Sequence, residues 1–160
     1  MRWTAPAARA GLGVGVPDPF YAIRPGREGD HAFVVESWQI AHAQTRLGRE
    51  QGPHYVSEQK GLIRDILSRP TTELRVACVL EDIDAILGYA VVGLVCDPEP
   101  RAYYAYTKAE ARRLGIARAL LADLLDKPVC YTHRPQSTLA DAIPRPPLWY
   151  FSYFKNWEPT

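Results

Sequence analysis

The stretch that decides the fold reads Tyr103-Tyr-Ala-Tyr-Thr-Lys-Ala-Glu-Ala-Arg-Arg-Leu-Gly-Ile-Ala117. It begins within a tyrosine-rich run, Ala102–Thr107, that is typical of a β-strand. Leucine and isoleucine at helical spacing then predict a helix from Gly115 to about Asp126. Amides at the start of a helix are unpaired and lie at its positive end, and Gly115 and Ala117 let a phosphate approach them. The stretch therefore predicts a strand, a turn that can hold a diphosphate or another phosphate group, and a helix.

The flanking segments predict the order β, α, α, β, β, β, α, β, loop, β. Asp30 is placed to cap the first helix and Ser57 the second, and Pro70 ends the second. The remaining predicted elements are a strand at Tyr21–Arg24, a helix over about His31 to Gln44, a hairpin of Leu74–Glu81 and Ala85–Val95 with its turn at Asp82–Asp84, and strands at Val129–His133 and Leu148–Phe154.

Length and composition predict one globular domain. The chain has 160 residues, 47% of them hydrophobic, and a formal net charge of +1, which gives no general support for binding to nucleic acid or to a membrane surface. No run approaches the roughly 18 apolar residues of a membrane span. We expect a flexible arm over residues 1–19 and the domain over residues 20–160. The three cysteines, Cys78, Cys96 and Cys130, have no metal-ligand spacing, so we expect reduced thiols in the cytoplasm and no metal.

The motif Arg112-Arg113-Leu114-Gly115-Ile116-Ala117, in its strand, turn and helix context, resembles the acetyl-coenzyme A site of the GNAT N-acetyltransferase superfamily. Tyr21-Ala-Ile-Arg-Pro25 looks like that family's opening strand, and the resemblance covers about two thirds of the chain. Ser37-Trp38, Thr132-His133 and the aromatic end are similar to phage and prophage members. The resemblance implies an α/β (α+β) fold with a mixed, mostly antiparallel central sheet, flanking helices and a splayed strand pair at the coenzyme site.

The resemblance also implies a function: direct transfer of an acetyl group from acetyl-coenzyme A to a primary amine of a small molecule or a protein, without a metal. The coenzyme-binding residues that it implies are Tyr106, Thr107, Arg112, Arg113, Leu114, Gly115, Ile116, Ala117 and Arg118.

Two departures from the family concern catalysis. The family usually follows its fifth strand with a helix whose tyrosine protonates the thiolate, whereas Arg134–Pro147 is too rich in proline for a full helix and predicts a loop. The central strand also lacks the glutamate that several members use as a base. His133 is then the candidate base, with packing at a strand end as an equal alternative. Tyr104 and Tyr106, on the strand face opposite Tyr103, are the candidate acids.

Two other functions stay open at this stage. The missing acid and base allow a coenzyme A-binding interaction module without turnover. An enzyme that modifies nucleic acid, with Arg134, Arg145 and the C-terminal aromatic residues as its contact surface, is less favoured. The acceptor is not encoded in the spacing, and the oligomeric state is open, a homodimer included.

Overall fold

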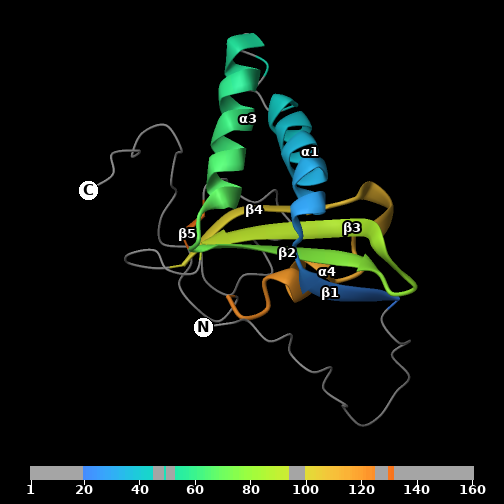
Figure 1. The fold of residues 1–160 in the computed structure, drawn as a ribbon. Helices are drawn as coiled ribbons and strands as arrows, with labels where there is room; N and C mark the ends of the chain where they lie inside the picture. The colour runs from blue at the N-terminus through green and yellow to red at the C-terminus, as the bar shows by residue number, and fades with distance from the viewer. Residues whose placement is uncertain (1–19, 45–48, 50–52, 94–99, 125–129, 132–160) are drawn as a thin grey trace, which may run out of the picture.

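The computed structural model describes residues 20–44, 49, 53–93, 100–124 and 130–131. Within these ranges, five strands form one sheet whose spatial order is the order of the chain, β1-β2-β3-β4-β5 (Figure 1). The first four strands are antiparallel to their neighbours, and β5 runs parallel to β4. The strands are β1 (Tyr21–Pro25), β2 (Thr72–Val79), β3 (Asp82–Gly93), β4 (Arg101–Thr107) and β5 (Cys130–Tyr131).

The described helices lie on both faces of the sheet. Helices α1 (His31–Ala43) and α3 (Pro53–Ser68) stand side by side on one face, and α4 (Ile116–Leu120) lies on the other (Figure 1). Two short 3-10 turns, η1 (Glu28–Asp30) and η2 (Ala109–Ala111), precede α1 and α4. None of the helices in the described ranges combines the length and the apolar character that crossing a membrane requires.

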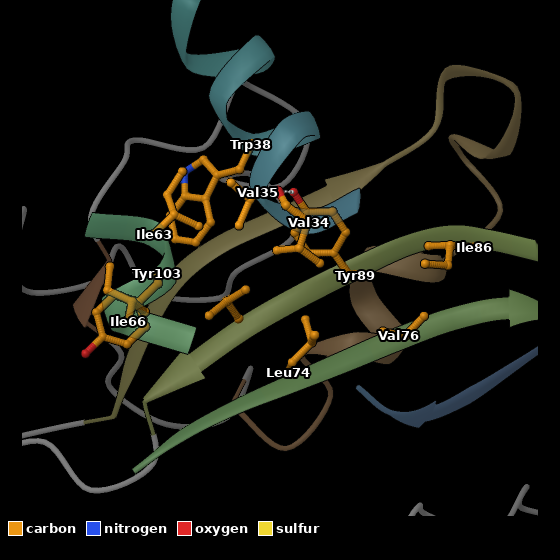
Figure 2. Close-up of a cluster of buried hydrophobic side chains, with 11 residues drawn as sticks. Val34, Val35, Trp38, Ile63, Ile66, Leu74, Val76, Ile86, Tyr89 and Tyr103 are labelled. Carbon is orange, nitrogen blue, oxygen red and sulfur yellow. Dashed lines mark hydrogen bonds between the residues drawn. The ribbon is translucent and has the colours of Figure 1, made fainter. Parts of the chain in front are cut away.

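The core between the sheet and the helices α1 and α3 is built from large side chains (Figure 2). Trp38 of α1 and Tyr89 of β3 are both fully buried there. The Tyr89 hydroxyl also donates a hydrogen bond to the Val34 carbonyl at 3.2 Å and lies 2.9 Å from the Ser37 hydroxyl. Burying a large apolar side chain stabilises a fold by about 1.5–3 kcal/mol. We call this cluster, between the sheet and helices α1 and α3, the helix-side core. It fixes α1 over the centre of the sheet.

The core under α4 differs because the sheet contributes small side chains there. Ala77 and Ala90 face Ile116 and Leu120 of α4 in a second buried cluster. Alanine leaves room for the helix axis to come close to the strands, which brings the connection between β4 and α4 against the sheet.

Several sequence-based boundaries are wrong. The hairpin turns at residues 80–81, and Asp82–Asp84 belongs to β3. Helix α3 begins at Pro53 rather than at Ser57, because proline is tolerated in the first turn of a helix. The regular part of α4 ends at Leu120, and residues 121–124 follow as turns.

Asp30 occupies the N-cap position of α1, but its carboxylate makes no capping bond to that helix. It accepts hydrogen bonds from the Arg24 guanidinium at 2.7 and 2.9 Å and from the Arg27 amide at 2.7 Å. A charged partner outcompetes the helix amides for this carboxylate. The predicted arm at residues 1–19, the loop Arg134–Pro147 and the strand Leu148–Phe154 lie outside the described residues.

Candidate coenzyme and active site

Strand β4 contains an irregularity beside the candidate catalytic tyrosines. Val91 of β3 faces Tyr104, but the next residue, Val92, faces Ala102, so Tyr103 is an extra residue on β4. One extra residue shifts the alternation of side chains by one place. Tyr103 is therefore buried in the helix-side core, against which Tyr104 and Tyr106 also pack. The prediction that Tyr103 lies on the opposite face is wrong.

Aromatic rings surround the two candidate acids. Tyr104 stacks on Trp38 with ring centroids 4.8 Å apart and planes 9° from parallel. Tyr106 stacks on Tyr89 at 5.5 Å and meets the edge of Phe33 at 6.2 Å. Both tyrosines are half-buried. Helix α1 thus fixes the rings of β4 from one side.

Burial raises the pKa of Tyr104 to about 12, with a smaller contribution from Tyr106 in the same direction and an opposing one from Arg112. Burial likewise raises the pKa of Tyr89, whose hydroxyl contacts Ser37. A phenol with such a pKa is fully protonated at neutral pH, so Tyr104 presents an O–H donor and not an anion.

The connection from β4 to α4 has an unusual backbone. After η2, Arg113 has φ 66° and Gly115 has φ 79°, both in the left-handed region. In a turn, such residues can orient neighbouring amides toward one side, an arrangement that favours anions. The Arg112 guanidinium donates to the Thr107 carbonyl at 3.4 Å, which closes the connection back onto the end of β4.

Six consecutive amides of this connection, those of residues 113–118, have no hydrogen-bond acceptor within the described part of the chain. We call residues 113–118 the coenzyme turn, after the ligand that the sequence predicts for them. Arg112, Arg113 and Arg118 are exposed beside it. A Cβ added at Gly115 would meet nothing closer than the Tyr21 hydroxyl at 4.0 Å, so the turn is open at this point.

Apart from Tyr104, the sequence-predicted site residues fall into two groups, the coenzyme residues and the candidate base. Tyr106 and Thr107 end β4, and residues 112–118 follow in the same connection, so the structure brings the predicted coenzyme residues together. Among them the Ile116 side chain is buried under the sheet, so only its amide is available. His133 lies outside the described residues, and its role stays a prediction.

Two residues that sequence reasoning missed shape this region. At Gly88 of β3, a Cβ would lie 2.6 Å from the Tyr106 carbonyl oxygen and 3.2 Å from Ile116. Arg75, a charged residue between Leu74 and Val76 of β2, is fully buried and contacts the end of α4. The signals were an isolated glycine and an isolated arginine within apolar strands.

The fold of the chain is similar to those of several solved structures. An acetyl transferase candidate from Pyrococcus furiosus has a TM-score of 0.59 and 18% identity, over 76% of this chain and 87% of its own. An acetyltransferase candidate from Clostridium difficile gives 0.53 and 16%, over 76% and 84%. A GNAT-family acetyltransferase candidate from Desulfovibrio desulfuricans gives 0.46 and 20%, over 66% and 64%. No protein-family model and no curated protein matches the chain.

The chain has the GNAT fold. The prediction of a mixed, mostly antiparallel sheet flanked by helices is confirmed. In this GNAT fold the described pairing of β4 with β5 covers only Arg101 with Cys130 and Ala102 with Tyr131, at the start of β4. The rest of β4 continues toward the coenzyme turn, and the splay of the two strands stays a prediction because residues beyond 131 lie outside the described ranges.

Proposed function

We propose that the chain is an acetyl-coenzyme A-dependent N-acetyltransferase that acetylates a primary amine of a small molecule or a protein by direct transfer. The GNAT fold supports the reaction class. The observation that carries the proposal is the coenzyme turn, with its six open amides and its two left-handed residues at the end of β4.

The chemistry of the turn fits the coenzyme. Backbone N–H groups and guanidinium groups are the donors that phosphate oxygens prefer, and both kinds occur in residues 112–118. None of these seven residues is acidic. In the proposal the amides of residues 113–118 hold the diphosphate, and Arg112 and Arg113 contact the diphosphate or the 3′-phosphate. When bound, acetyl-coenzyme A supplies an acetyl group activated as a thioester.

The protein's own groups then act on the transfer. A backbone N–H of β4 donates to the carbonyl oxygen of the thioester and stabilises the charge that develops there. His133 accepts the proton that the amine loses, and the hydroxyl of Tyr104 or Tyr106 donates one to the sulfur that leaves. The raised pKa of Tyr104 suits it to donation, because its proton is present throughout the neutral range.

The first experiment tests coenzyme binding through thermal stability. Acetyl-coenzyme A at about 100 times its Kd stabilises the folded state by about 2.7 kcal/mol, and we expect the melting temperature to rise by about 5–10 °C. Gly115→Asp places a negative charge where the phosphates bind, so we expect it to abolish this rise. A Cβ at this position would meet only the Tyr21 hydroxyl, at 4.0 Å, so the cost of the substitution to the fold comes from the left-handed backbone and not from a clash at the Cβ.

Gly115→Asn is the matched control. Asparagine has the shape of aspartate and both adopt left-handed backbone conformations, but it carries no charge. It should keep a large part of the coenzyme-induced rise while lowering the intrinsic melting temperature about as much as Gly115→Asp. An undiminished rise in a folded Gly115→Asp variant contradicts the coenzyme assignment.

The second experiment separates an enzyme from a binding module. Release of free thiol from acetyl-coenzyme A is followed with a panel of primary amines, in which small amines and peptides with free amino groups are separate arms. We expect amine-dependent turnover by the wild-type chain. Coenzyme binding without turnover on any amine would instead support the interaction module.

A further inference from the structure

Arg75 is a buried charge in the middle of the sheet. It lies in β2 between Leu74 and Val76, and its side chain is 1% exposed. Removing a charge from water is costly unless hydrogen-bonding partners of opposite charge surround it, so such a residue persists where it makes specific contacts. The role of Arg75 in this fold can therefore be inferred from its hydrogen-bond partners.

The contacts of Arg75 join two elements. One nitrogen, Nη1, donates to the Leu120 carbonyl at 2.9 Å and to Asp123 Oδ1 at 2.5 Å, and Nη2 donates to Asp123 Oδ2 at 2.9 Å. Leu120 is the last residue of α4, and Asp123 lies in the turns that follow it. Glu73, the third partner at 3.4 Å, belongs to β2 itself and bridges nothing.

Helix α4 depends on such a contact because it is short. Five residues form little more than one turn, and isolated helices of this length are not stable in water. The Leu120 carbonyl lies at the negative end of the helix, where a cation is favourable. At a rise of about 1.5 Å per residue, the start of the helix at Ile116 is only about 6 Å from this anchor at Leu120. Movement at the anchored end is therefore transmitted to the coenzyme turn.

We propose that Arg75, paired with Asp123, is a positioning residue that holds α4 on the sheet and keeps the amides of residues 113–118 arranged for the coenzyme. This inference rests on the proposed function. Arginine suits this role because its planar guanidinium has several N–H donors. One side chain can therefore bind a carbonyl and both oxygens of a carboxylate on another element.

Asp123→Ala tests the bridge. Asp123 is 40% exposed, so its replacement leaves little new cavity in the core. We expect the Kd for acetyl-coenzyme A to rise about tenfold, because displaced amides no longer converge on the phosphates. Electrostatics alone predicts the opposite sign, because losing an acid near an anion site strengthens anion binding.

Glu73→Ala is the matched control. It removes another carboxylate that contacts the same guanidinium, with the same change in net charge, but leaves the bridge to α4 in place. We expect its Kd to stay within twofold of the wild type. In activity assays the Asp123→Ala effect should fall on KM for acetyl-coenzyme A, and Asp123→Asn, which keeps one acceptor, should recover part of it.

Amide hydrogen exchange in the free protein supplies a readout that needs no ligand. It is followed at Ala119 and Leu121, whose amides donate to the carbonyls of Gly115 and Ala117 in the coenzyme turn at 2.9 and 3.2 Å. Exchange should accelerate in Asp123→Ala and stay unchanged in Glu73→Ala. Unchanged or tighter coenzyme binding by Asp123→Ala, or equal effects of the two variants, overturns the positioning role. If the wild type binds no coenzyme, the proposed function fails, while the exchange comparison still decides whether the bridge orders the turn.

Discussion

Tyr104 makes a direct prediction at the scale of a single residue. Tyr104→Phe removes a hydroxyl and keeps the stacking on Trp38, so the fold should be retained. If this hydroxyl protonates the leaving sulfur, kcat should fall on the order of 10²-fold with the Kd for acetyl-coenzyme A unchanged. Steady-state kinetics with a calorimetric Kd measure the two quantities. Tyr106→Phe is the parallel variant, and full activity of both would place the acid elsewhere.

His133 makes the corresponding prediction for the base. The wild-type rate should rise with pH through about 6.5, the usual pKa of imidazole, as the acceptor nitrogen becomes free of its proton. His133→Ala should lower kcat by roughly 10²–10⁴-fold and remove this rise, with little change in coenzyme affinity. Full activity of His133→Ala across the pH range would assign the histidine a structural role.

Asp30 shows what a single residue in a sequence does not reveal. Its position before α1 is correctly predicted, but its partner is Arg24, which lies six residues earlier in β1. Rules for helix caps consider only the side chain and the backbone of the helix that follows. Arg24 contacts Asp30 because the fold brings the end of β1 beside the start of α1. The role of Arg75 was missed for the same reason, since its partners in and after α4, Leu120 and Asp123, lie 45 and 48 residues away.

At the scale of elements, Gly88 sets the distance between β3 and the end of β4. We expect Gly88→Ala to lower the free energy of unfolding by about 1–3 kcal/mol, because its methyl group would press on the Tyr106 carbonyl oxygen and no flexible side chain can yield. Gly61→Ala in α3 is the control, since a Cβ there meets no atom within 4 Å. It should stabilise the helix by roughly 0.5–1 kcal/mol. Urea unfolding compares the two, and equal effects would contradict the close contact at Gly88.

The elements of the candidate site were predictable to different degrees. Strand β4 and the open turn after it follow from tyrosines in alternation and from the Gly115 position, because both signals are local. The extra residue at Tyr103 was not predictable, since alternation assumes regular pairing and the shift depends on β3. The short length of α4 was also not predictable. Leu121 and Leu124 continue the helical spacing, but they are buried in the core equally well from the turns at residues 121–124.

The stability of the whole molecule should depend on pH in three steps. Hydrogen bonds from Arg24 lower the pKa of Asp30, so its contribution is present above about pH 3.9 and is lost as pH falls through the lowered value. Burial lowers the pKa of His42, so below about pH 6.5 the unfolded chain binds a proton that the folded chain does not, and stability falls. Burial raises the pKa of Tyr104 to about 12 and also raises the pKa of Tyr89, so above about pH 10 the unfolded chain loses protons first and stability falls again.

We therefore expect the free energy of unfolding to be greatest between about pH 6.5 and pH 10, as measured by urea unfolding at fixed ionic strength. His42→Gln should remove the first acid step and Asp30→Asn the second. Tyr104→Phe should make the alkaline limb shallower, with the contribution of Tyr89 left in place. An alkaline limb that is identical in Tyr104→Phe would contradict the raised pKa of this phenol.

The order of the described sheet, in which each strand lies beside the next one along the chain, has a consequence for biosynthesis. The described residues of the helix-side core lie between positions 33 and 106, so the elements that contribute them are synthesised before α4 leaves the ribosome. Because domains are assembled as they are synthesised from the N-terminus, the coenzyme turn is laid onto a surface that already exists. A nascent chain halted just after β4 should thus already protect its backbone from proteolysis while having no affinity for the coenzyme.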